Sequence, residues 1–162
     1  MEIERKFLVK KMPEDLERYP GKRMEQAYLT TDPVIRVRKE EFFSKMGDGK
    51  PEKEEYILTY KGKGLMAREE HNLPLTIEAY ETLAGKAEGN VIRKKRYLLP
   101  IENTGLTVEL DVFMPPFAPL VMAEVEFGSM EEAEAFEPPS WFGEEVTEDP
   151  AYHNSTLSRR IL

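Results

Sequence analysis

Like-charged residues recur two positions apart in this sequence, within segments whose other residues are mainly apolar. The run Glu2 to Lys6 (EIERK) opens the series, and Arg36 and Arg38 alternate with apolar residues in the segment VIRVR. Residues two apart on a β-strand point to the same face of the sheet, so each pair would place its charges side by side. The same spacing relates the like-charged pairs Lys94 and Arg96, Glu109 and Asp111, and Glu124 and Glu126, and also the mixed pairs Thr59 and Lys61, and Arg68 and Glu70.

These residue types are suited to binding a metal ion and a phosphate group together. Clustered carboxylates without histidine or cysteine ligands favour a hard cation such as Mg²⁺ or Mn²⁺ over zinc. Clustered arginine and lysine bind phosphate oxygens, and arginine can do so through two hydrogen bonds at once. A cation held by carboxylates beside a polyphosphate held by basic residues is what phosphoryl transfer requires. The pattern therefore indicates chemistry on a polyphosphate.

The sequence offers no obvious set of residues for nucleophilic catalysis. It contains no cysteine and only two histidines, His71 and His153. We interpret each histidine as an exposed or structural residue, and no serine forms an apparent catalytic pair with either. Direct attack by a water molecule, activated by a metal ion or a carboxylate, is the predicted mechanism.

A polar strand face can also simply meet bulk water, and for a single strand that is the ordinary interpretation. Repetition argues against it here, because faces that need only solubility usually mix uncharged polar residues with charges of both signs. Like charges close together on one face repel, so these pairs make sense if each cluster faces an opposite charge. A closed barrel whose polar faces point inward provides that arrangement around a wet interior.

Most of the chain is expected to form short antiparallel strands. Apolar residues alternate with polar ones, and turn signals such as Thr31-Asp32-Pro33 and Gly47-Asp48-Gly49 separate the segments. About eight such strands indicate a barrel or a sandwich, hence an α+β fold that is mostly β. Two short helices are predicted at 76–84 and 129–136, and a last helix or ordered arm at 150–162. The predicted strands cover residues 3–9, 26–30, 34–43, 55–61, 66–73, 91–99, 105–113 and 120–127.

Length and composition limit the class of protein. The chain has 162 residues, 40% of them hydrophobic and 33% charged, which suits one domain with a real core. Its formal net charge of −8 argues against a nucleic-acid-binding surface. It allows a small anionic ligand, since charges more than about 8 Å apart are largely screened. No apolar run approaches the roughly 18 residues that span a bilayer, and the acidic residue after Met1 argues against a signal peptide. We expect a cytoplasmic protein that binds neither nucleic acid nor membrane.

Three details outside the charged pairs carry expectations of their own. Arg5 falls on the outward strand face, where a surface salt bridge or packing of its aliphatic stem is expected. Tyr28 is interpreted as a packing residue. The charged, glycine-containing stretch 39–55 is interpreted as the solvated tip of a long hairpin.

Taken in order, these segments resemble the CYTH superfamily, also called the triphosphate tunnel metalloenzymes, and within it the small bacterial members. EIERK matches the family's ExExK signature, and VIRVR, LTYKG, REE, RKKRY, VELDVF and AEVEF follow in the family's order, before WFGEEVT and YHNSTL. ExExK alone has little specificity. The ordered set covers nearly the whole chain, apart from the 40–54 hairpin, and implies a single CYTH domain over residues 1–162.

The resemblance implies a particular architecture and substrate site. The fold would be an eight-stranded antiparallel β-barrel that forms a tunnel, with short helices packed outside and a C-terminal helix, residues 152–162, near one mouth. The triphosphate of the substrate would lie among the basic residues Lys6, Arg36, Arg38, Lys61, Arg68, Lys94 and Arg96.

Metal-binding and catalytic roles are implied in the same way. Mg²⁺ or Mn²⁺ would be held by Glu2 and Glu4 together with a carboxylate of a C-terminal strand. Glu126 is the first choice for that carboxylate and Glu124 the second. The acidic pair Glu109 and Asp111 would bind a second metal ion or activate water. The catalytic set is therefore Glu2, Glu4, Lys6, Glu109 and Asp111.

The preferred activity is hydrolysis of inorganic triphosphate by attack of water on a terminal phosphoryl group, because compact members with EIERK and WFGEEV look most like inorganic triphosphatases. Alternatives are a nucleoside or thiamine triphosphatase and a class IV-type adenylate cyclase, although no base-binding pocket stands out. From another class, the protein could be a non-catalytic polyphosphate- or nucleotide-binding module. Retention of Glu2, Glu4, Glu124 and Glu126 favours catalysis. Assembly as a homodimer stays open.

Overall fold

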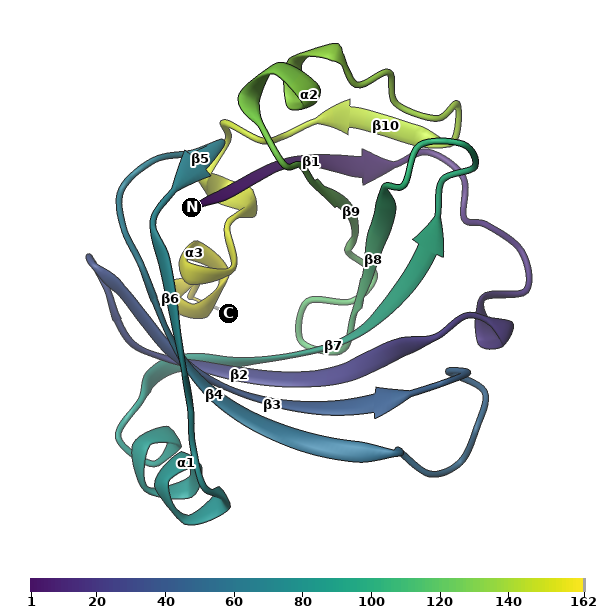
Figure 1. Cartoon of the computed structure of the whole chain (residues 1–162). Helices are drawn as coiled ribbons and strands as arrows, with labels where there is room; N and C mark the ends of the chain where they lie inside the picture. Colours follow the sequence, from purple (N-terminus) through teal and green to yellow (C-terminus); the bar gives the residue numbers. More distant parts are fainter. Residues whose placement is uncertain (162) are drawn as a thin grey trace.

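The computed structural model describes residues 1–161 and is dominated by β-structure (Figure 1). Its strands are β1 (Glu2–Val9), β2 (Gly21–Thr31), β3 (Val34–Phe43), β4 (Lys53–Lys61), β5 (Ala67–Arg68), β6 (Glu70–Pro74), β7 (Glu88–Pro100), β8 (Thr107–Phe113), β9 (Val121–Glu126) and β10 (Phe142–Glu145). Its helices are α1 (Ile77–Ala84), α2 (Met130–Ala135) and α3 (Asn154–Arg159), with the 3₁₀ turns η1 (Leu16–Arg18) and η2 (Pro150–Tyr152). No helix in this described part is long and apolar enough to span a membrane.

The strands form one antiparallel sheet that curls into a barrel (Figure 1). Its order is β10-β1-β9-β8-β7-β2-β3-β4-β6, and β5 pairs with β1. Only Glu69 separates β5 from β6, so these two segments act as one interrupted strand that joins β4 to β1 and closes the ring. Counted in this way, the barrel has the eight strands that the sequence predicts. The short β10 adds to the remaining free edge of β1.

Two parts of the sheet differ from the predicted strands. β10 is not among them, because four residues are too few to show an alternating pattern. β2 begins at Gly21 instead of residue 26, since its first residues are polar on both faces. The two predicted helices are confirmed, and a side chain caps the first turn of each. The Thr76 side chain accepts a hydrogen bond from Ala79 N at 3.1 Å, and Ser129 accepts one from Glu132 N at 3.1 Å.

The hairpin between β3 and β4 is more than a solvated loop. Met46 is 8% exposed and packs in the main hydrophobic cluster. Its backbone N donates to Tyr19 O at 2.8 Å, and Gly47 N donates to Glu17 O at 2.8 Å. The hairpin tip therefore folds back on η1, and the exposure predicted for 39–55 is wrong at Glu40, Phe43 and Met46. Charge and glycine content hid this anchor because a single methionine leaves no periodic signal.

The largest hydrophobic cluster lies on the outer face of the barrel. It joins outward residues of β1, β8 and β9, such as Phe7, Val108 and Val125, to Ala133 of α2 and Phe142 of β10. A separate cluster packs Tyr80 of α1 against the outer face of β2 and β3. Figure 1 shows α1 and α2 outside the ring of strands. Because the outer surface supplies this apolar burial, the interior is left for polar residues.

One end of the interior is nevertheless apolar. On β1, β3, β7, β8 and β9, the inward positions are charged at one end and become apolar further along. The apolar inward residues are Leu8, Val34, Ile92, Phe113 and Met122, and Leu157 of α3 packs among them. The barrel interior therefore has a charged half and a closed, apolar half. Alternation predicts which residues face inward, but it does not show that they form two layers.

Helix α3 is held at this apolar end by contacts with β7. The Asn90 side chain donates from Nδ2 to the backbone oxygens of Leu157 at 3.1 Å and Arg160 at 2.7 Å. Gly89 has φ of 81°, and a Cβ built there would lie 2.2 Å from Ser158 O. A helix at one end of the barrel matches the prediction for 152–162, except that residue 162 lies outside the described part of the chain.

Replacing Gly89 with alanine should therefore displace α3. We expect Gly89→Ala to lose about 3 kcal/mol or more in free energy of unfolding, because a left-handed alanine and a close contact with Ser158 add together. Urea unfolding measures this loss. Gly105→Ala is the matched control, because Gly105 has φ of 72° but nothing lies within 4 Å of its Cβ. That control should lose only about 1–2 kcal/mol, and equal losses in the two variants would contradict the close packing of α3 on Gly89.

Candidate active site

A cavity of about 280 Å³ occupies the charged half of the barrel interior. Eight lysine and arginine side chains and seven glutamates line it. The lining therefore has a slight excess of positive charge, although the whole chain carries a formal net charge of −8. Apolar lining is limited to Val34, Ile57 and the ring of Tyr28. A ligand that complements this lining would be small, polar and negatively charged.

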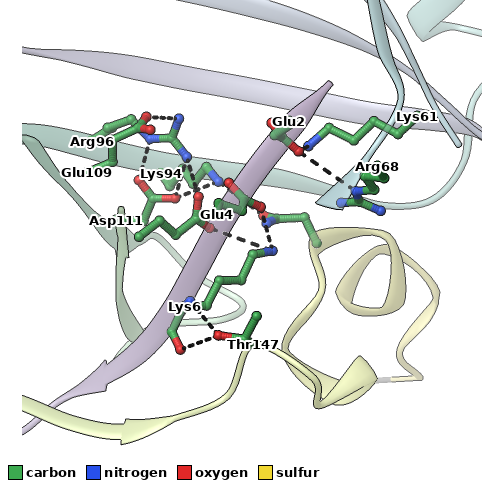
Figure 2. Close-up of polar contacts among 12 residues, drawn as sticks. Glu2, Glu4, Lys6, Lys61, Arg68, Lys94, Arg96, Glu109, Asp111 and Thr147 are labelled. Carbon is green, nitrogen blue, oxygen red and sulfur yellow. Dashed lines mark hydrogen bonds and ion pairs between the residues drawn. The ribbon is translucent and has the colours of Figure 1, made fainter. Parts of the chain in front are cut away.

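Strand β1 places two carboxylates and an ammonium group along one side of the cavity (Figure 2). Lys6 Nζ lies 3.6 Å from Glu4 Oε1 and 3.8 Å from Glu124 Oε1. Burial acts to lower the pKa of Lys6, but these two carboxylates hold it above its ordinary value. Glu2 Oε1 accepts a hydrogen bond from Lys61 Nζ at 2.9 Å and lies 3.8 Å from Arg68 Nε.

The backbone of β1 is fixed at Lys6 by the segment that follows β10. Lys6 N donates to Thr147 Oγ1 at 2.9 Å, and Val146 N donates to Lys6 O at 2.8 Å. Thr147 Oγ1 in turn donates to Glu145 Oε2 at 2.7 Å. These bonds fix the Lys6 main chain along one edge of β1, and strand alternation directs its side chain into the cavity (Figure 2).

A second ionic cluster surrounds Arg96 (Figure 2). Its Nε and Nη2 bind the two oxygens of Asp111 at 2.7 and 2.9 Å, and its Nη1 binds Glu109 Oε2 at 2.6 Å. Lys94 Nζ lies 2.7 Å from Asp111 Oδ2 and donates to Asn154 Oδ1 at 3.2 Å. Burial lowers the pKa of Lys94 to about 8. Arg96 and Lys94 hold the pKa of Asp111 well below its usual range, against the effect of burial.

Arg36 and Arg38 differ from the other basic residues of the cavity, because among the described residues no carboxylate forms an ion pair with either one. Arg36 is 6% exposed, and its Nε has no hydrogen-bond partner. Arg38 Nε donates to the neutral Oε1 of Gln26 at 2.8 Å. Burial, together with Arg36 and Arg96, lowers the pKa of Arg38 to about 10, so it stays charged near neutral pH. These two neighbouring cations have no ion-paired carboxylate, and they therefore form the strongest anion-binding feature of the cavity.

The carboxylates at the other side of the cavity fit a divalent cation. Glu4 and Glu126 lie directly opposite each other on β1 and β9, an arrangement that destabilises the sheet unless a cation lies near. Burial raises the pKa of Glu126, and so do its neighbours Glu109, Glu2 and Glu4. In the part of the chain that the structure describes, no three acidic, histidine or cysteine side chains form a ready-made cage. Mg²⁺ usually needs only one or two carboxylates plus waters and substrate phosphates, so this donor set suits it.

Comparison with known proteins shows where this site belongs. An inorganic triphosphatase of Nitrosomonas europaea is 39% identical over 164 residues, which cover 99% of this chain and 98% of that protein. One from Acetivibrio thermocellus is 35% identical over 96% of this chain and 92% of its own length. The chain belongs to the inorganic triphosphatase family. A crystal structure of an inorganic triphosphatase superposes with a TM-score of 0.66 at 36% identity, covering 99% of this chain and 96% of the other. No family model matches the chain.

The structure of this inorganic triphosphatase family member brings nearly all of the predicted site residues to one cavity. The predicted basic residues Lys6, Arg36, Arg38, Lys61, Arg68, Lys94 and Arg96 all line it, as do Glu2, Glu4, Glu109, Glu124 and Glu126. Asp111 is the exception. It is fully buried behind Arg96 and Lys94, with both oxygens bonded to them. The structure therefore places Asp111 where it pairs with two cations and does not reach the cavity, unlike the other residues of the predicted catalytic set.

Several lining residues are not among the predicted ones. One signal was available, because Glu40 extends the Arg36 and Arg38 spacing by a further two positions. Its carboxylate lies 2.6 Å from Lys22 Nζ. Burial acts to raise the pKa of Glu40, but Arg38 and Lys22 hold it below its ordinary value. The other missed residues include three at the start of α3, which tertiary packing brings to the cavity. The polar lining residues outside the predicted site are Lys22, Glu40, Thr59, Glu70, Asn72, His153, Asn154 and Ser155, of which Thr59 and Glu70 belong to the period-two pattern of the sequence.

Four individual residues can be compared with their expectations. His71 is exposed, as expected. His153 is buried and lines the cavity, and burial and Lys6 lower its pKa. The ring of Tyr28 packs in the apolar half as expected, while the residue also lines the cavity. Arg5 forms the expected outward salt bridge, with Nη2 2.6 Å from Glu145 Oε1.

Proposed function

We propose that this protein is a divalent-metal-dependent inorganic triphosphatase of the CYTH, or triphosphate tunnel metalloenzyme, superfamily, with residues 1–162 as its single domain. The observation that carries the proposal is the pair Arg36 and Arg38, two inward cations without carboxylate partners, in the same cavity as the facing carboxylates Glu4 and Glu126. A polyphosphate with a bound divalent cation would neutralise both groups at once. The relatives named above carry the same activity in their names.

Inorganic triphosphate suits this cavity better than a nucleotide. Its lining is almost entirely polar, and Val34, Ile57 and Tyr28 are its apolar and aromatic members. Tyr28 is packed among buried apolar residues, so its ring is not free to stack on a base. Recognition of a base usually requires an aromatic or apolar surface and hydrogen bonds to its edge. The lining therefore favours a ligand made of phosphate groups alone.

Glu4 and Glu126, with Glu2 close by, are the residues that would hold the metal ion, for which we propose Mg²⁺ or Mn²⁺. The chemistry that the ion supplies when bound is neutralisation of phosphate charge and polarisation of the bond that is attacked. Glu124 is a weaker candidate ligand, because it shares Lys6 with Glu4 and in addition lies 3.4 Å from Arg96 Nη2.

The basic residues of the cavity would bind and orient the three phosphate groups. Arg36 and Arg38 have unused donors, and each guanidinium can give two parallel hydrogen bonds to phosphate oxygens. Lys61 is 6% exposed and lies between Glu2 and Glu70, at 2.9 and 3.5 Å. Lys6 is shared by Glu4 and Glu124, which places it between the proposed metal ligands and the Arg96 cluster. Such fixed cations stabilise negative charge that develops during phosphoryl transfer.

Glu109 is the carboxylate best suited to accept a proton from the attacking water. It lines the cavity, unlike Asp111. Burial raises the pKa of Glu109 above its ordinary value, despite the bond to Arg96 and with the help of Glu124 and Asp111. A raised pKa makes a carboxylate a better proton acceptor near neutral pH. The reaction would consume one water molecule and release phosphate and pyrophosphate.

Phosphate release from three substrates tests the proposal. Purified protein would be incubated with tripolyphosphate, ATP or thiamine triphosphate, with Mg²⁺ or Mn²⁺ and with EDTA. We expect metal-dependent turnover of tripolyphosphate at the highest kcat/KM of the three. Absence of metal-dependent turnover of all three would overturn the hydrolase assignment. Preferred turnover of ATP or thiamine triphosphate would overturn the choice of substrate, and formation of cyclic AMP would indicate a cyclase.

A further inference from the structure

Gln26 is a fully buried amide that contacts two cavity-lining residues. Its side chain has no exposed surface. Its Oε1 accepts a hydrogen bond from Arg38 Nε at 2.8 Å, and its Nε2 donates to the Tyr28 hydroxyl at 3.2 Å. Gln26 does not itself line the cavity, whereas Arg38 and Tyr28 both do. It therefore sits behind the two residues and holds both.

The acceptor for Arg38 is neutral, which sets this guanidinium apart from those of Arg96 and Arg68 in the same cavity. Arg96 is held by the carboxylates of Asp111 and Glu109. Arg68 lies 3.8 Å from Glu2. A carboxylate partner fixes a guanidinium but also cancels much of its charge, whereas an amide oxygen fixes it and leaves the charge in place. Arg38 therefore has no ion-paired carboxylate of its own, since the nearby Glu40 is paired with Lys22 at 2.6 Å, and its charge is directed at the cavity.

The two hydrogen bonds also fix the orientation of the amide. Arg38 can only donate, so Oε1 must face its Nε, and the amide NH₂ must then point toward Tyr28. The Tyr28 oxygen consequently accepts a hydrogen bond, which leaves its own O–H free to point elsewhere. One buried side chain thus determines the position of a cation and the direction of a hydroxyl.

We propose that Gln26 is a positioning residue for substrate binding: it holds the Arg38 guanidinium and the Tyr28 hydroxyl in place without neutralising Arg38, so that this charge is reserved for a phosphate group. The proposal rests on the proposed function for the identity of the ligand. The positioning role of Gln26 is inferred only from its hydrogen bonds with Arg38 and Tyr28. The ligand class is a polyphosphate anion, for which inorganic tripolyphosphate is the probe.

Two substitutions separate charge from packing. Gln26→Glu keeps the size and the acceptor but supplies a carboxylate to Arg38, while Gln26→Met keeps the approximate volume and removes the acceptor. With EDTA present, we expect Gln26→Glu to bind tripolyphosphate roughly 10–100-fold more weakly than the unchanged protein, which is the effect of losing one charged hydrogen-bonding group. With the metal ion supplied, its KM should rise more than its kcat falls. Calorimetric titration and steady-state kinetics measure these changes.

Thermal unfolding without any ligand supplies a second readout. Gln26→Glu should raise the unfolding temperature of the otherwise unchanged protein, because Arg38 gains an anionic partner. In an Arg38→Met background the same substitution should lower it, because the new carboxylate is buried without a partner. With Arg38 intact, Gln26→Met should lower the unfolding temperature. A residue that merely packs would shift the temperature in the same direction in both backgrounds.

The outcomes distinguish this inference from the proposed function. If the unchanged protein neither binds nor hydrolyses tripolyphosphate, the proposed function fails, and the sign change in unfolding temperature still decides the role of Gln26. If the unchanged protein binds tripolyphosphate and Gln26→Glu binds it equally well, the inference is overturned. A shift of the same sign in the two backgrounds overturns it as well.

Discussion

Replacing Glu4 with glutamine is expected to lower kcat/KM for inorganic triphosphate about a thousand-fold. The amide keeps the shape of the side chain but loses the negative charge that would hold a divalent cation opposite Glu126. A metal ion contributes several kcal/mol to stabilising charge in the transition state, and each 1.36 kcal/mol corresponds to about tenfold in rate. Initial rates at a series of Mg²⁺ concentrations measure the loss and show whether extra metal restores part of the activity.

The fold should tolerate this change, because Glu4→Gln relieves the repulsion between Glu4 and Glu126 across β1 and β9, while Lys6 keeps Glu124 as an anionic partner. Circular dichroism and urea unfolding should match those of the unchanged protein. Glu144→Gln is the control, since Glu144 is an exposed residue of β10, the strand beside β1, and full activity is expected there. Full activity in Glu4→Gln would show that the metal ligands have been assigned to the wrong residues.

Replacing Arg36 with methionine is expected to change ligand binding and stability in opposite directions. Arg36 is 6% exposed, its Nε has no partner, and no carboxylate forms an ion pair with it among the described residues. Removing such a cation relieves its desolvation cost, so the ligand-free protein should gain about 1–4 kcal/mol in free energy of unfolding. Loss of its hydrogen bonds to phosphate should weaken tripolyphosphate binding roughly 10–100-fold.

Thermal unfolding with and without tripolyphosphate tests both parts. The ligand should raise the unfolding temperature of Arg36→Met less than that of the unchanged protein, because ligand stabilisation falls as the dissociation constant rises. Arg93→Met is the control. Its side chain is 51% exposed and forms a surface pair with Glu25, so its removal should cost at most about 1 kcal/mol and leave binding unchanged. A free Arg36→Met protein that is less stable than the unchanged one would contradict the view that Arg36 is held at a cost.

The sequence pattern predicts the faces of strands well. Period-two spacing correctly placed Glu4, Arg36, Lys94 and Glu124 on inward faces, because alternation follows directly from strand geometry. Alternation also predicts the barrel, because turn residues divide the chain into short strands whose charged faces need a shared interior. Helix boundaries could also be predicted at Thr76 and Ser129, since their side chains cap the first turn locally.

Depth along the barrel could not be predicted in this way. Asp111 lies two positions after Glu109 on the same face of β8. It is nevertheless buried beneath Arg96, while Glu109 reaches the cavity. The depth of each residue depends on strand stagger and on its cross-strand neighbours, which no local pattern encodes. His153 and Asn154 come to the site only because α3 packs across the apolar end. Their sequence segment carries no alternation that would place them there.

The pairing of β1 also has a consequence for the order of folding. The strand that carries Glu2, Glu4 and Lys6 pairs with β5, β9 and β10, and with none of the strands that immediately follow it in the chain. Closing such long loops costs entropy before any contact compensates it, so non-local pairings of this kind form slowly. A nascent or partly folded chain can assemble the β2-β3-β4 meander early and still lack one wall of its catalytic cavity. Recovery of activity during refolding should therefore follow, and not precede, the recovery of β-structure.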